Sequence, residues 1–334
     1  MSKKRKTMFL IVILISLFIL FIISFIFIGS APRAEKISWG VNFSQKQAVL
    51  LGLDWRKVYL ALLDDLKVKD IKLAAHWDFI ENERDKYYFN DLDWQVEEAE
   101  KRNVKTLLVI GMKVPCWPEC HIPSWAKNLN KEEQQKEILE LIEKIVLRYR
   151  DSSTIEMWQV ENEPFFPFGE CPWKEKKFLE KEINLVKSLD NKKRPIVVSD
   201  SGEFSLWVTA ARYGDIVGVT MYKKVWFKEL KTYISYPFPP VFYWRKAQII
   251  KKFFNKDIIC VELQAEPWGP LLLYDLKLEE QEKSMNLERL KYNIEFAEKT
   301  GFDKFYLWGA EWWYWLKEKQ NKPQIWQEVK KMWN

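Results

Sequence analysis

The chain reads IEMWQVENEP over residues 155–164, a run of buried-strand character followed by Glu163 and a Pro. The apolar residues of this run predict a strand, and the Pro after Glu163 predicts that the strand gives way to a loop there. A second stretch has the same design, because DIICVE at residues 257–262 leads an apolar run directly into Glu262. Each stretch therefore places a carboxylate where a predicted strand meets a loop.

Predicted strands and helices alternate along the chain from residue 37 onward, and each type occurs eight times. This alternation permits either an open doubly wound sheet or a barrel, and the number eight favours a closed (β/α)8 TIM barrel. No GxGxxG or GxxxxGK[ST] follows the first strand, which weakens the nucleotide-binding alternative. The predicted strands cover 37–43, 71–75, 105–111, 155–160, 195–199, 216–221, 257–261 and 304–308, and the helices 55–66, 92–102, 130–149, 175–189, 204–212, 246–254, 286–299 and 323–333.

An apolar run from Met8 to Ile28 follows a basic cluster at residues 3–6. A run of this length predicts a single transmembrane helix, and the basic residues before it place the N-terminus in the cytoplasm. We expect an uncleaved signal anchor, although Ser30-Ala31 resembles a cleavage site and cleavage would give a secreted protein. The predicted organisation is a cytoplasmic stub and membrane anchor over 1–30, a short tether over 31–36, and an extracytoplasmic (β/α)8 domain over 37–334.

The amino-acid composition and net charge indicate which kinds of binding partner the chain could have. Hydrophobic residues make up 48% of the 334 residues, enough for a full core, and aromatic residues 16%, with 18 Trp. Because this exceeds what a core needs, part of the aromatic surface is expected to line a groove. The formal net charge of +6 is mild and spread over predicted helical faces, which argues against a nucleic-acid partner. The oligomeric state is not predicted.

The cysteines and histidines argue against a metal centre. Cys116, Cys120 and Cys171 fall in predicted loops, and Cys260 lies inside an apolar strand run, where a buried thiol is expected. Outside the cytoplasm disulfides persist, so one bridge to Cys171 is plausible. A zinc site is disfavoured because the chain has two His and no second CxxC pair. We predict no metal and no cofactor.

A barrel fold would bring the carboxylates of Glu163 and Glu262 to the same face of the domain. All strand C-termini meet at one face of a (β/α)8 barrel, and the fourth and seventh strands, which lead to Glu163 and Glu262, lie across its mouth. On these positions the sequence resembles the retaining glycoside hydrolases of clan A, whose member families include family 5. The resembling motifs are WQVENEP at 158–164, ICVE at 259–262, WDFIE at 77–81 with YF at 88–89 and LD at 92–93, GDIVGVTMY at 214–222, and FYLWG at 305–309.

The resemblance implies a role for each residue of the predicted site. Glu163 would be the acid/base and Glu262 the nucleophile, since a retaining mechanism needs two carboxyl groups of which one stays protonated. Asn162 would hydrogen-bond the sugar 2-OH, Tyr222 would position the nucleophile, and Trp308 would form the floor of the sugar site. In the chain itself Glu266 is a competitor of Glu262, which is preferred because it directly follows the apolar run.

One position departs from the resemblance. Clan A families usually carry an Arg on the second strand that braces the nucleophile, and here Lys72 stands on that strand. Lys keeps the charge and loses the planar fork of Arg. His76 lies near the same strand tip and is expected to share the bracing role or to be a satisfied core His. The remaining predicted substrate contacts are Trp77 and loop tryptophans around the mouth, chief among them Trp117 and Trp268.

Two functions remain open from the sequence. The first is a membrane-anchored retaining glycoside hydrolase that cleaves β-linked oligo- or polysaccharides outside the cytoplasm. The second is a catalytically weak or inactive barrel that binds glycan, which the Lys72 departure would support. A metal-dependent hydrolase on the same fold is disfavoured by the two His.

Overall fold

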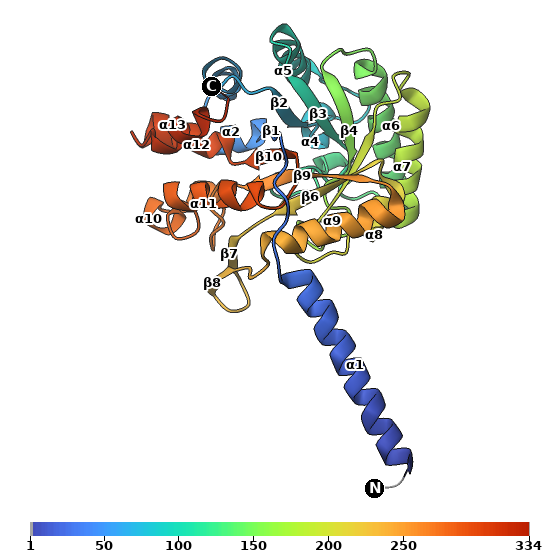
Figure 1. The fold of residues 1–334 in the computed structure, drawn as a ribbon. Helices are drawn as coiled ribbons and strands as arrows, with labels where there is room; N and C mark the ends of the chain where they lie inside the picture. The colour runs from blue at the N-terminus through green and yellow to red at the C-terminus, as the bar shows by residue number, and fades with distance from the viewer. Residues whose placement is uncertain (1–2, 334) are drawn as a thin grey trace.

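The computed structural model describes residues 3–333 and contains a closed barrel of eight parallel strands (Figure 1). Around the barrel the strands follow chain order, and β1 closes the ring against β10. All eight predicted strands are present, so the predicted (β/α)8 fold is confirmed. The barrel strands are β1 (Ser38–Phe43), β2 (Asp70–Ala74), β3 (Lys105–Ile110), β4 (Ile155–Val160), β5 (Ile196–Asp200), β6 (Ile216–Met221), β9 (Asp257–Gln264) and β10 (Lys304–Trp308).

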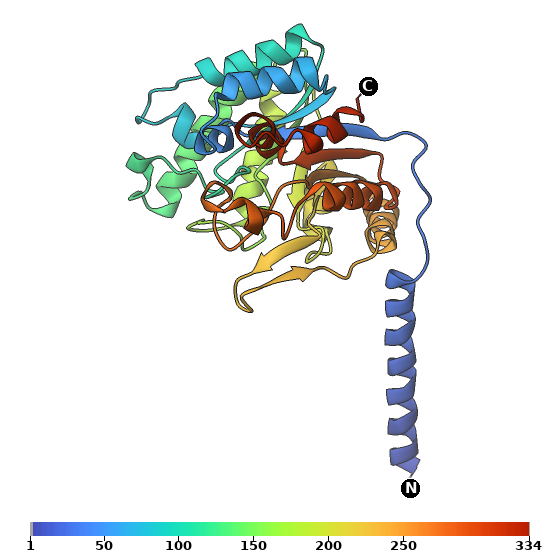
Figure 2. The same cartoon turned by 90° about the vertical axis from the view of Figure 1, so that its left-hand side faces the viewer.

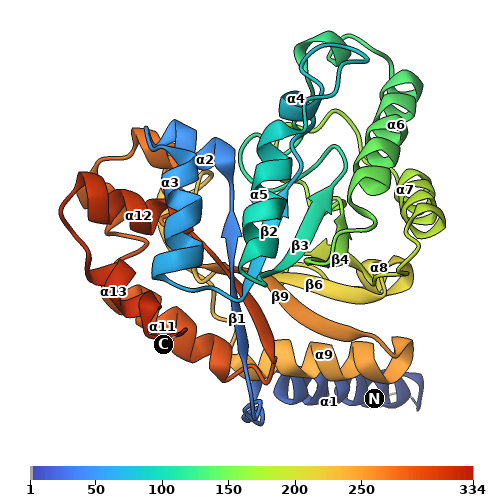
Figure 3. The ribbon, with the colours of Figure 1, turned by 90° about the horizontal axis from the view of Figure 1, so that it is seen from above.

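Helices flank the barrel strands on several sides (Figure 3). The helices that correspond to predicted ones are α3 (Trp55–Leu60, continued by a π-helical turn over Ala61–Asp65), α5 (Asn90–Lys101), α6 (Lys131–Tyr149), α7 (Lys176–Leu189), α8 (Val208–Tyr213), α9 (Pro240–Phe254), α11 (Leu287–Glu298) and α13 (Gln324–Lys330). Further helices that were not predicted are α2 (Gln45–Leu50), α4 (Trp77–Ile80), α10 (Leu278–Gln281) and α12 (Ala310–Lys319), with 3₁₀ turns at Ser124–Ala126 and Leu273–Asp275.

Two apolar layers hold the barrel together. Because side chains alternate along a strand, Leu107 of β3 packs inside the barrel while Leu108 packs against the surrounding helices. The interior layer also contains Met157, Val197, Ile259, Val261 and Tyr306. Helix α6 begins with the predicted capping box, in which Asn130 and Glu133 each accept a hydrogen bond from the other's backbone N–H.

The region 223–240, expected to be an aromatic and Pro-rich loop, is more regular than predicted. It contains an antiparallel hairpin of β7 (Lys224–Phe227) and β8 (Thr232–Ser235) that projects from the barrel (Figure 2). Cross-strand packing explains the hairpin, because Trp226 pairs with Tyr233 and their ring centroids lie 5.1 Å apart.

The N-terminal helix α1 (Lys3–Phe27) extends away from the barrel (Figures 1 and 2). By length and composition its segment Leu10–Phe27 is apolar enough to cross a membrane. Its last turn contacts α9, where the Phe27 ring centroid lies 5.5 Å from that of Phe242. Residues 1, 2 and 334, which the predicted anchor and barrel segments include, lie outside the described residues, as do the side chains of the basic cluster at 3–6.

A disulfide joins two loops at the mouth of the barrel. Cys120, in the loop after β3, is bonded to Cys171, in the loop after β4. Cys116 and Cys260 are buried free thiols, as expected for Cys260. The bridge to Cys171 is therefore present, with Cys120 as its partner.

Candidate active site

The chain leaves β4 through an unusual backbone conformation. Glu161 and Glu163 both have positive φ angles, of 60° and 42°, which non-glycine residues adopt only when surrounding contacts impose them. Here the carboxylate of Glu161 accepts hydrogen bonds from the backbone N–H groups of Met112 and Lys113, each 2.7 Å long. The N–H of Glu163 donates to Ser199 Oγ at 2.8 Å. These bonds fix the turn that presents Glu163 at the end of the strand.

The carboxyl group of Glu163 is buried beside other acids. Its Oε1 accepts a hydrogen bond from the Thr220 hydroxyl at 3.0 Å. Burial raises the pKa of Glu163 well above its usual value, and the negative charges of Glu262 and Glu119 raise that pKa further. Both effects favour the protonated form of Glu163.

Glu262 lies in β9, two residues before the strand ends, and not at its tip as predicted. Its Oε1 accepts a hydrogen bond from Lys72 Nζ at 3.0 Å, and its Oε2 accepts one from the Tyr222 hydroxyl at 2.9 Å. The side chain of Lys72 is 1% exposed, so this is a buried ion pair. The two hydrogen bonds fix the orientation of the Glu262 carboxyl group.

One residue links the two carboxyl groups. Thr220 on β6 is the register partner of Glu262 on β9, and its hydroxyl contacts Glu163. The pairing of these strands shifts register between Val219 and Thr220. Register irregularities of this kind turn side chains toward functional sites. Glu163 and Glu262 therefore occupy the same corner of the barrel mouth.

A cleft of about 650 Å³ opens over this pair. Of the predicted substrate-contact residues, five line it: Asn162, Tyr222, Trp308, Trp117 and Trp268. Further aromatic side chains on the loops complete its walls, namely Phe166, Phe168, Phe204, Trp226, Phe227, Tyr236 and Tyr274. The aromatic content of the sequence is thus divided between the core and this cleft.

Two predicted contacts lie elsewhere. Trp77 is fully buried, packs edge-on against Trp125 and donates from Nε1 to Glu81, so the prediction that it contacts substrate is wrong. His76 is buried against His121 and does not bond to Glu262, so it takes no part in bracing the nucleophile. Burial, with the nearby charge of Lys46, lowers the pKa of His76 to about 3.

Sequence reasoning missed three acidic residues that line the cleft with the catalytic candidates. Burial and the charge of Glu262 raise the pKa of Glu119 to about 8. Burial and the charge of Glu311 raise the pKa of Glu266 to about 8, and burial raises that of Glu203 to about 7. Glu266 was considered only as a competitor of Glu262. Its Oε1 is bonded to Trp308 Nε1 at 2.7 Å instead.

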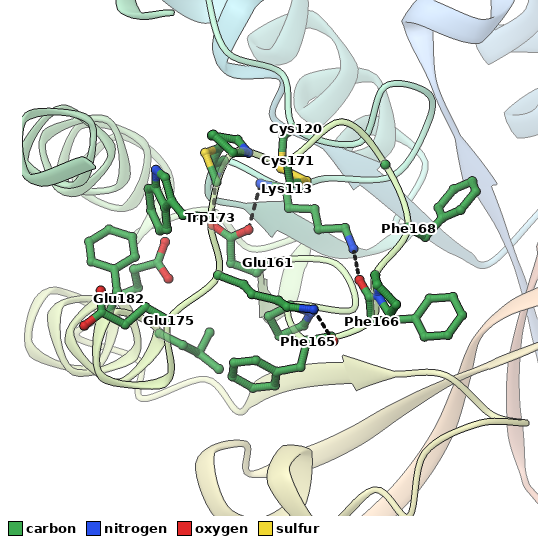
Figure 4. Close-up of a pocket in the computed structure, with 18 residues that line it drawn as sticks. Lys113, Cys120, Glu161, Phe165, Phe166, Phe168, Cys171, Trp173, Glu175 and Glu182 are labelled. Carbon is green, nitrogen blue, oxygen red and sulfur yellow. Dashed lines mark hydrogen bonds between the residues drawn. A yellow bond between two sulfur atoms is a disulfide. The ribbon is translucent and has the colours of Figure 1, made fainter. Parts of the chain in front are cut away.

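A smaller pocket of about 320 Å³ lies behind the loop that follows β4 (Figure 4). It contains Glu161 and Glu182, whose carboxyl groups share a hydrogen bond that requires one of them to be protonated. Lys113 donates from Nζ to the carbonyl oxygens of Glu163 and Phe166, and Figure 4 shows the second of these bonds. The pocket thus supports the turn that carries Glu163 from behind.

Comparison with known proteins connects this geometry to a group of enzymes. The profile of glycosyl hydrolase family 10 matches residues 71–184, the part of the chain that runs from β2 into α7. A search of curated protein sequences finds no match. Many solved structures match, among them native xylanase 10B from Thermotoga maritima, which is 16% identical with a TM-score of 0.58. That alignment covers 89% of this chain and 95% of the xylanase.

Two further solved structures share the fold. GH5_18 from Streptomyces cattleya, solved in complex with GlcNAc, is 11% identical with a TM-score of 0.57, and the alignment covers 82% of this chain and 70% of that one. The β-galactosidase from Halorubrum lacusprofundi is 13% identical with a TM-score of 0.55. The alignment covers 81% of this chain, which spans about half (52%) of that β-galactosidase. The closed barrel and these neighbours show that the chain has the (β/α)8 fold, and its segment 71–184 is similar to glycosyl hydrolase family 10.

Proposed function

We propose that this chain is a retaining glycoside hydrolase that cleaves β-glycosidic bonds in an oligo- or polysaccharide, with Glu163 as acid/base and Glu262 as nucleophile. The observation that carries the proposal is the unequal setting of two carboxyl groups at one corner of the cleft. Burial and neighbouring negative charge raise the pKa of Glu163 and favour its protonated form, whereas Glu262 is paired with the cation of Lys72. This division is the one that double displacement requires.

In the first step a carboxylate oxygen of Glu262 attacks the anomeric carbon and forms a glycosyl ester. The bond between that carbon and the glycosidic oxygen breaks, and the proton of Glu163 moves to the departing oxygen. The hydrogen bonds from Lys72 and Tyr222 orient the attacking group. Trp117, Trp268 and Trp308 line the cleft and provide aromatic faces on which sugar rings can pack.

In the second step Glu163, now ionised, takes a proton from water while the water oxygen attacks the same carbon and releases Glu262. The geometry assists this change of role. The charge of Glu262 is one of the causes of the raised pKa of Glu163, and that charge disappears while Glu262 is esterified. The pKa of Glu163 therefore falls when it must act as a base.

The alternative of an inactive glycan-binding barrel rested on Lys72. Its Nζ makes the contact with the nucleophile candidate that the usual Arg would make, at 3.0 Å. The departure from the family pattern therefore leaves the charge compensation of Glu262 in place, and hydrolysis is the function that the site supports best.

We further propose that α1 anchors the chain in a membrane, with residues 1–30 as stub and anchor, 31–36 as tether and 37–334 as an extracytoplasmic catalytic domain. The apolar segment Leu10–Phe27 supports the anchor. The Cys120–Cys171 disulfide supports an oxidising compartment for the barrel.

The test of the proposal compares Glu163→Gln and Glu262→Gln with Glu170→Gln, an exposed glutamate in the same loop as Glu163. Each of the first two changes should lower hydrolysis of β-glycans by a factor of about 10³, the order expected for loss of an acid/base or a nucleophile. Glu170→Gln should not change the rate. Binding of the same glycans, measured by calorimetry, should persist in all three variants.

Azide separates the two roles. Added to Glu163→Ala, azide should restore turnover and give a β-glycosyl azide, because it takes the place of water on the ester of Glu262. Added to Glu262→Ala, it should give the α-glycosyl azide by direct displacement. Undiminished hydrolysis by either Gln variant, or the same azide anomer from both Ala variants, would refute the assignment.

A further inference from the structure

The cleft is lined by acidic groups and by no basic ones. Its charged side chains are Glu119, Glu163, Glu203, Glu262, Glu266 and Asp275, and among the described residues no Lys, Arg or His lines it. Lys72 touches Glu262 but lies buried outside this lining. The contrast with the whole chain, whose formal net charge is +6, shows that the acidity belongs to the cleft.

The proposed reaction uses only two of these carboxyl groups. Glu203 has a structural task, since its Oε1 accepts hydrogen bonds from the Tyr222 N–H and the Tyr243 hydroxyl. Glu266 bonds through one oxygen to Trp308, and its buried Oε2 has no hydrogen-bond partner within the described part of the chain. Glu119 is left without a role in this chemistry, although it is buried close to the nucleophile.

Glu119 is hydrogen-bonded to the residue that precedes the proposed acid/base. Its Oε2 accepts a hydrogen bond from Asn162 Nδ2 at 3.1 Å. Asn162 immediately precedes the proposed acid/base, and its Oδ1 already accepts from Gln159 Nε2 at 3.0 Å. If Asn162 hydrogen-bonds the substituent at C2 of the sugar, as the family resemblance implies, then the Glu119 carboxyl group bonded to Asn162 also lies near that substituent.

The loop after β3 is built to hold Glu119 in this place. Glu119 has a φ of 72°, its N–H donates to the Cys116 carbonyl at 2.7 Å, and its own carbonyl accepts from Val114 N–H at 2.9 Å. Gly169 in the neighbouring loop packs so closely that a Cβ there would lie 2.5 Å from the Glu119 Cβ. The Cys120–Cys171 bridge joins these two loops beside that contact. Glu119 is thus a fixed carboxyl group and not a mobile surface charge.

Such a lining favours one class of substrate over others. A uronic acid would bring a further negative charge into a cleft that has no cation to receive it. A neutral sugar would bring no charge that the acidic lining could complement. A protonated amine, by contrast, supplies hydrogen-bond donors and positive charge together, and aromatic faces such as those of Trp117 and Trp268 also attract cations.

We propose that the substrate is a β-linked glycan of amino sugars with free, unacetylated amines, and that Glu119 receives the ammonium group at C2 of the sugar in the reacting position. This inference rests on the proposed function, because it places that sugar beside Glu163 and Glu262. Glu119 acts here as a specificity-determining residue and takes no part in bond cleavage.

The titration of Glu119 supports the same assignment. With its pKa raised to about 8, Glu119 carries a proton at neutral pH in the free cleft. An ammonium group beside it favours the ionised form, so binding of an amino sugar lowers this pKa and expels the proton. A neutral sugar has no such effect.

Three tetrasaccharides provide the test, because they differ only at C2: the β-1,4-linked tetramers of glucosamine, N-acetylglucosamine and glucose. Binding is measured by calorimetry on the full chain in detergent, carrying Glu163→Gln so that nothing is hydrolysed. The glucosamine tetramer should bind about 30-fold more tightly than the other two, the order expected for a charge-assisted hydrogen bond. Titration at pH 5.5, where the glucosamine amines already carry their protons, in buffers of different ionisation enthalpy should show proton release for glucosamine alone.

Adding Glu119→Gln should reduce this preference to within about threefold, while adding Glu170→Gln should preserve it. Equal binding of the three tetramers, binding of none, or a preference that survives Glu119→Gln overturns the inference. The comparison of the three tetramers on the chain that carries only Glu163→Gln tests the inference even if the chain with Glu119→Gln added does not fold. If the chain binds the amine selectively but the unsubstituted chain hydrolyses no glycan, the proposed hydrolase activity is refuted and the amino-sugar specificity stands. If the unsubstituted chain hydrolyses glycans without a preference for the amine, the amino-sugar specificity is refuted and the hydrolase activity stands.

Discussion

Lys72 is the residue on which the charge balance of the site depends. It is 1% exposed and its Nζ lies 3.0 Å from Glu262 Oε1. Lys72→Met should therefore leave a buried carboxylate without its cation, which costs about 3–5 kcal/mol in the free energy of unfolding. We expect kcat/KM to fall by a factor of about 10² or more, because the nucleophile loses its orientation. Denaturant unfolding and steady-state kinetics measure the two effects.

Lys72→Arg is the matched control, since it restores the positive charge with a different shape. It should recover most of the stability that Lys72→Met loses. Lys187→Met, at an exposed surface ion pair with Asp215, should change the free energy of unfolding by less than about 1 kcal/mol. A Lys72→Met variant as stable and as active as the unsubstituted chain would show that the pair has no such role.

The residues that the sequence could predict are those placed by periodic structure. Glu163, Glu262 and Tyr222 follow or end apolar strand runs, so barrel geometry alone brings them to one mouth. Glu119 was missed because it lies in an irregular loop, where its position depends on a φ of 72° that no pattern of residues indicates. Trp77 was assigned wrongly because a tryptophan near a strand end suits a core as well as a cleft.

At the scale of elements, the disulfide connects the two loops that shape one wall of the cleft. Cys120 and Cys171 are 51 residues apart, and cross-linking at such a separation stabilises a fold by about 2–4 kcal/mol. Replacing both by Ala should lower the melting temperature and raise KM more than it lowers kcat. The reason is that Glu119 and Phe168 depend on these loops, whereas Glu262 is held by its strand.

Reducing agent gives an independent check on the role of the bridge. It should lower the melting temperature of the unsubstituted chain and leave that of the Ala pair unchanged. Cys260→Ala, at a buried free thiol, should respond to reductant as the unsubstituted chain does. An Ala pair with unaltered KM would contradict the view that the bridge positions the cleft wall.

Elements were predictable where apolar periodicity was strong and not where aromatic residues dominated. The hairpin of β7 and β8 contains Trp226, Phe227 and Tyr233, whose bulk masks the alternation that indicates strands. Helix α12 was missed for a related reason, because its AEWWYWLKEK sequence resembles an aromatic loop at a barrel mouth. In both cases packing against neighbouring rings decides the structure more than local propensity does.

For the whole molecule, the proposed anchor makes a prediction about partitioning. The full chain should sediment with membranes and require detergent for release, whereas a chain that begins at residue 37 should stay in the supernatant with an unchanged kcat/KM. The reason is that Phe25 and Phe27 of α1 contact Arg245 and Phe242 of α9 and Phe238 just before it, none of which lines the cleft. Fractionation followed by glycan hydrolysis checks both parts.

The control for fractionation is a full chain in which Leu14 and Leu17, exposed on α1, are each replaced by Lys. Charges in the middle of the apolar segment should abolish membrane association without touching the barrel. A full chain that remains soluble without detergent would refute the anchor, and an inactive chain from residue 37 would refute the proposed domain boundary.

The direction in which α1 leaves the barrel limits what the enzyme can reach. The barrel strands run crosswise to α1 (Figures 2 and 3), so an upright α1 would lay the barrel on its side above the lipid. The mouth of the barrel would then face parallel to the membrane surface. A polymer strand lying parallel to the cell surface could enter such an opening at a constant height, set by the few residues between α1 and β1. The chain would trim the layer of glycan nearest the membrane and leave the outer layers to others.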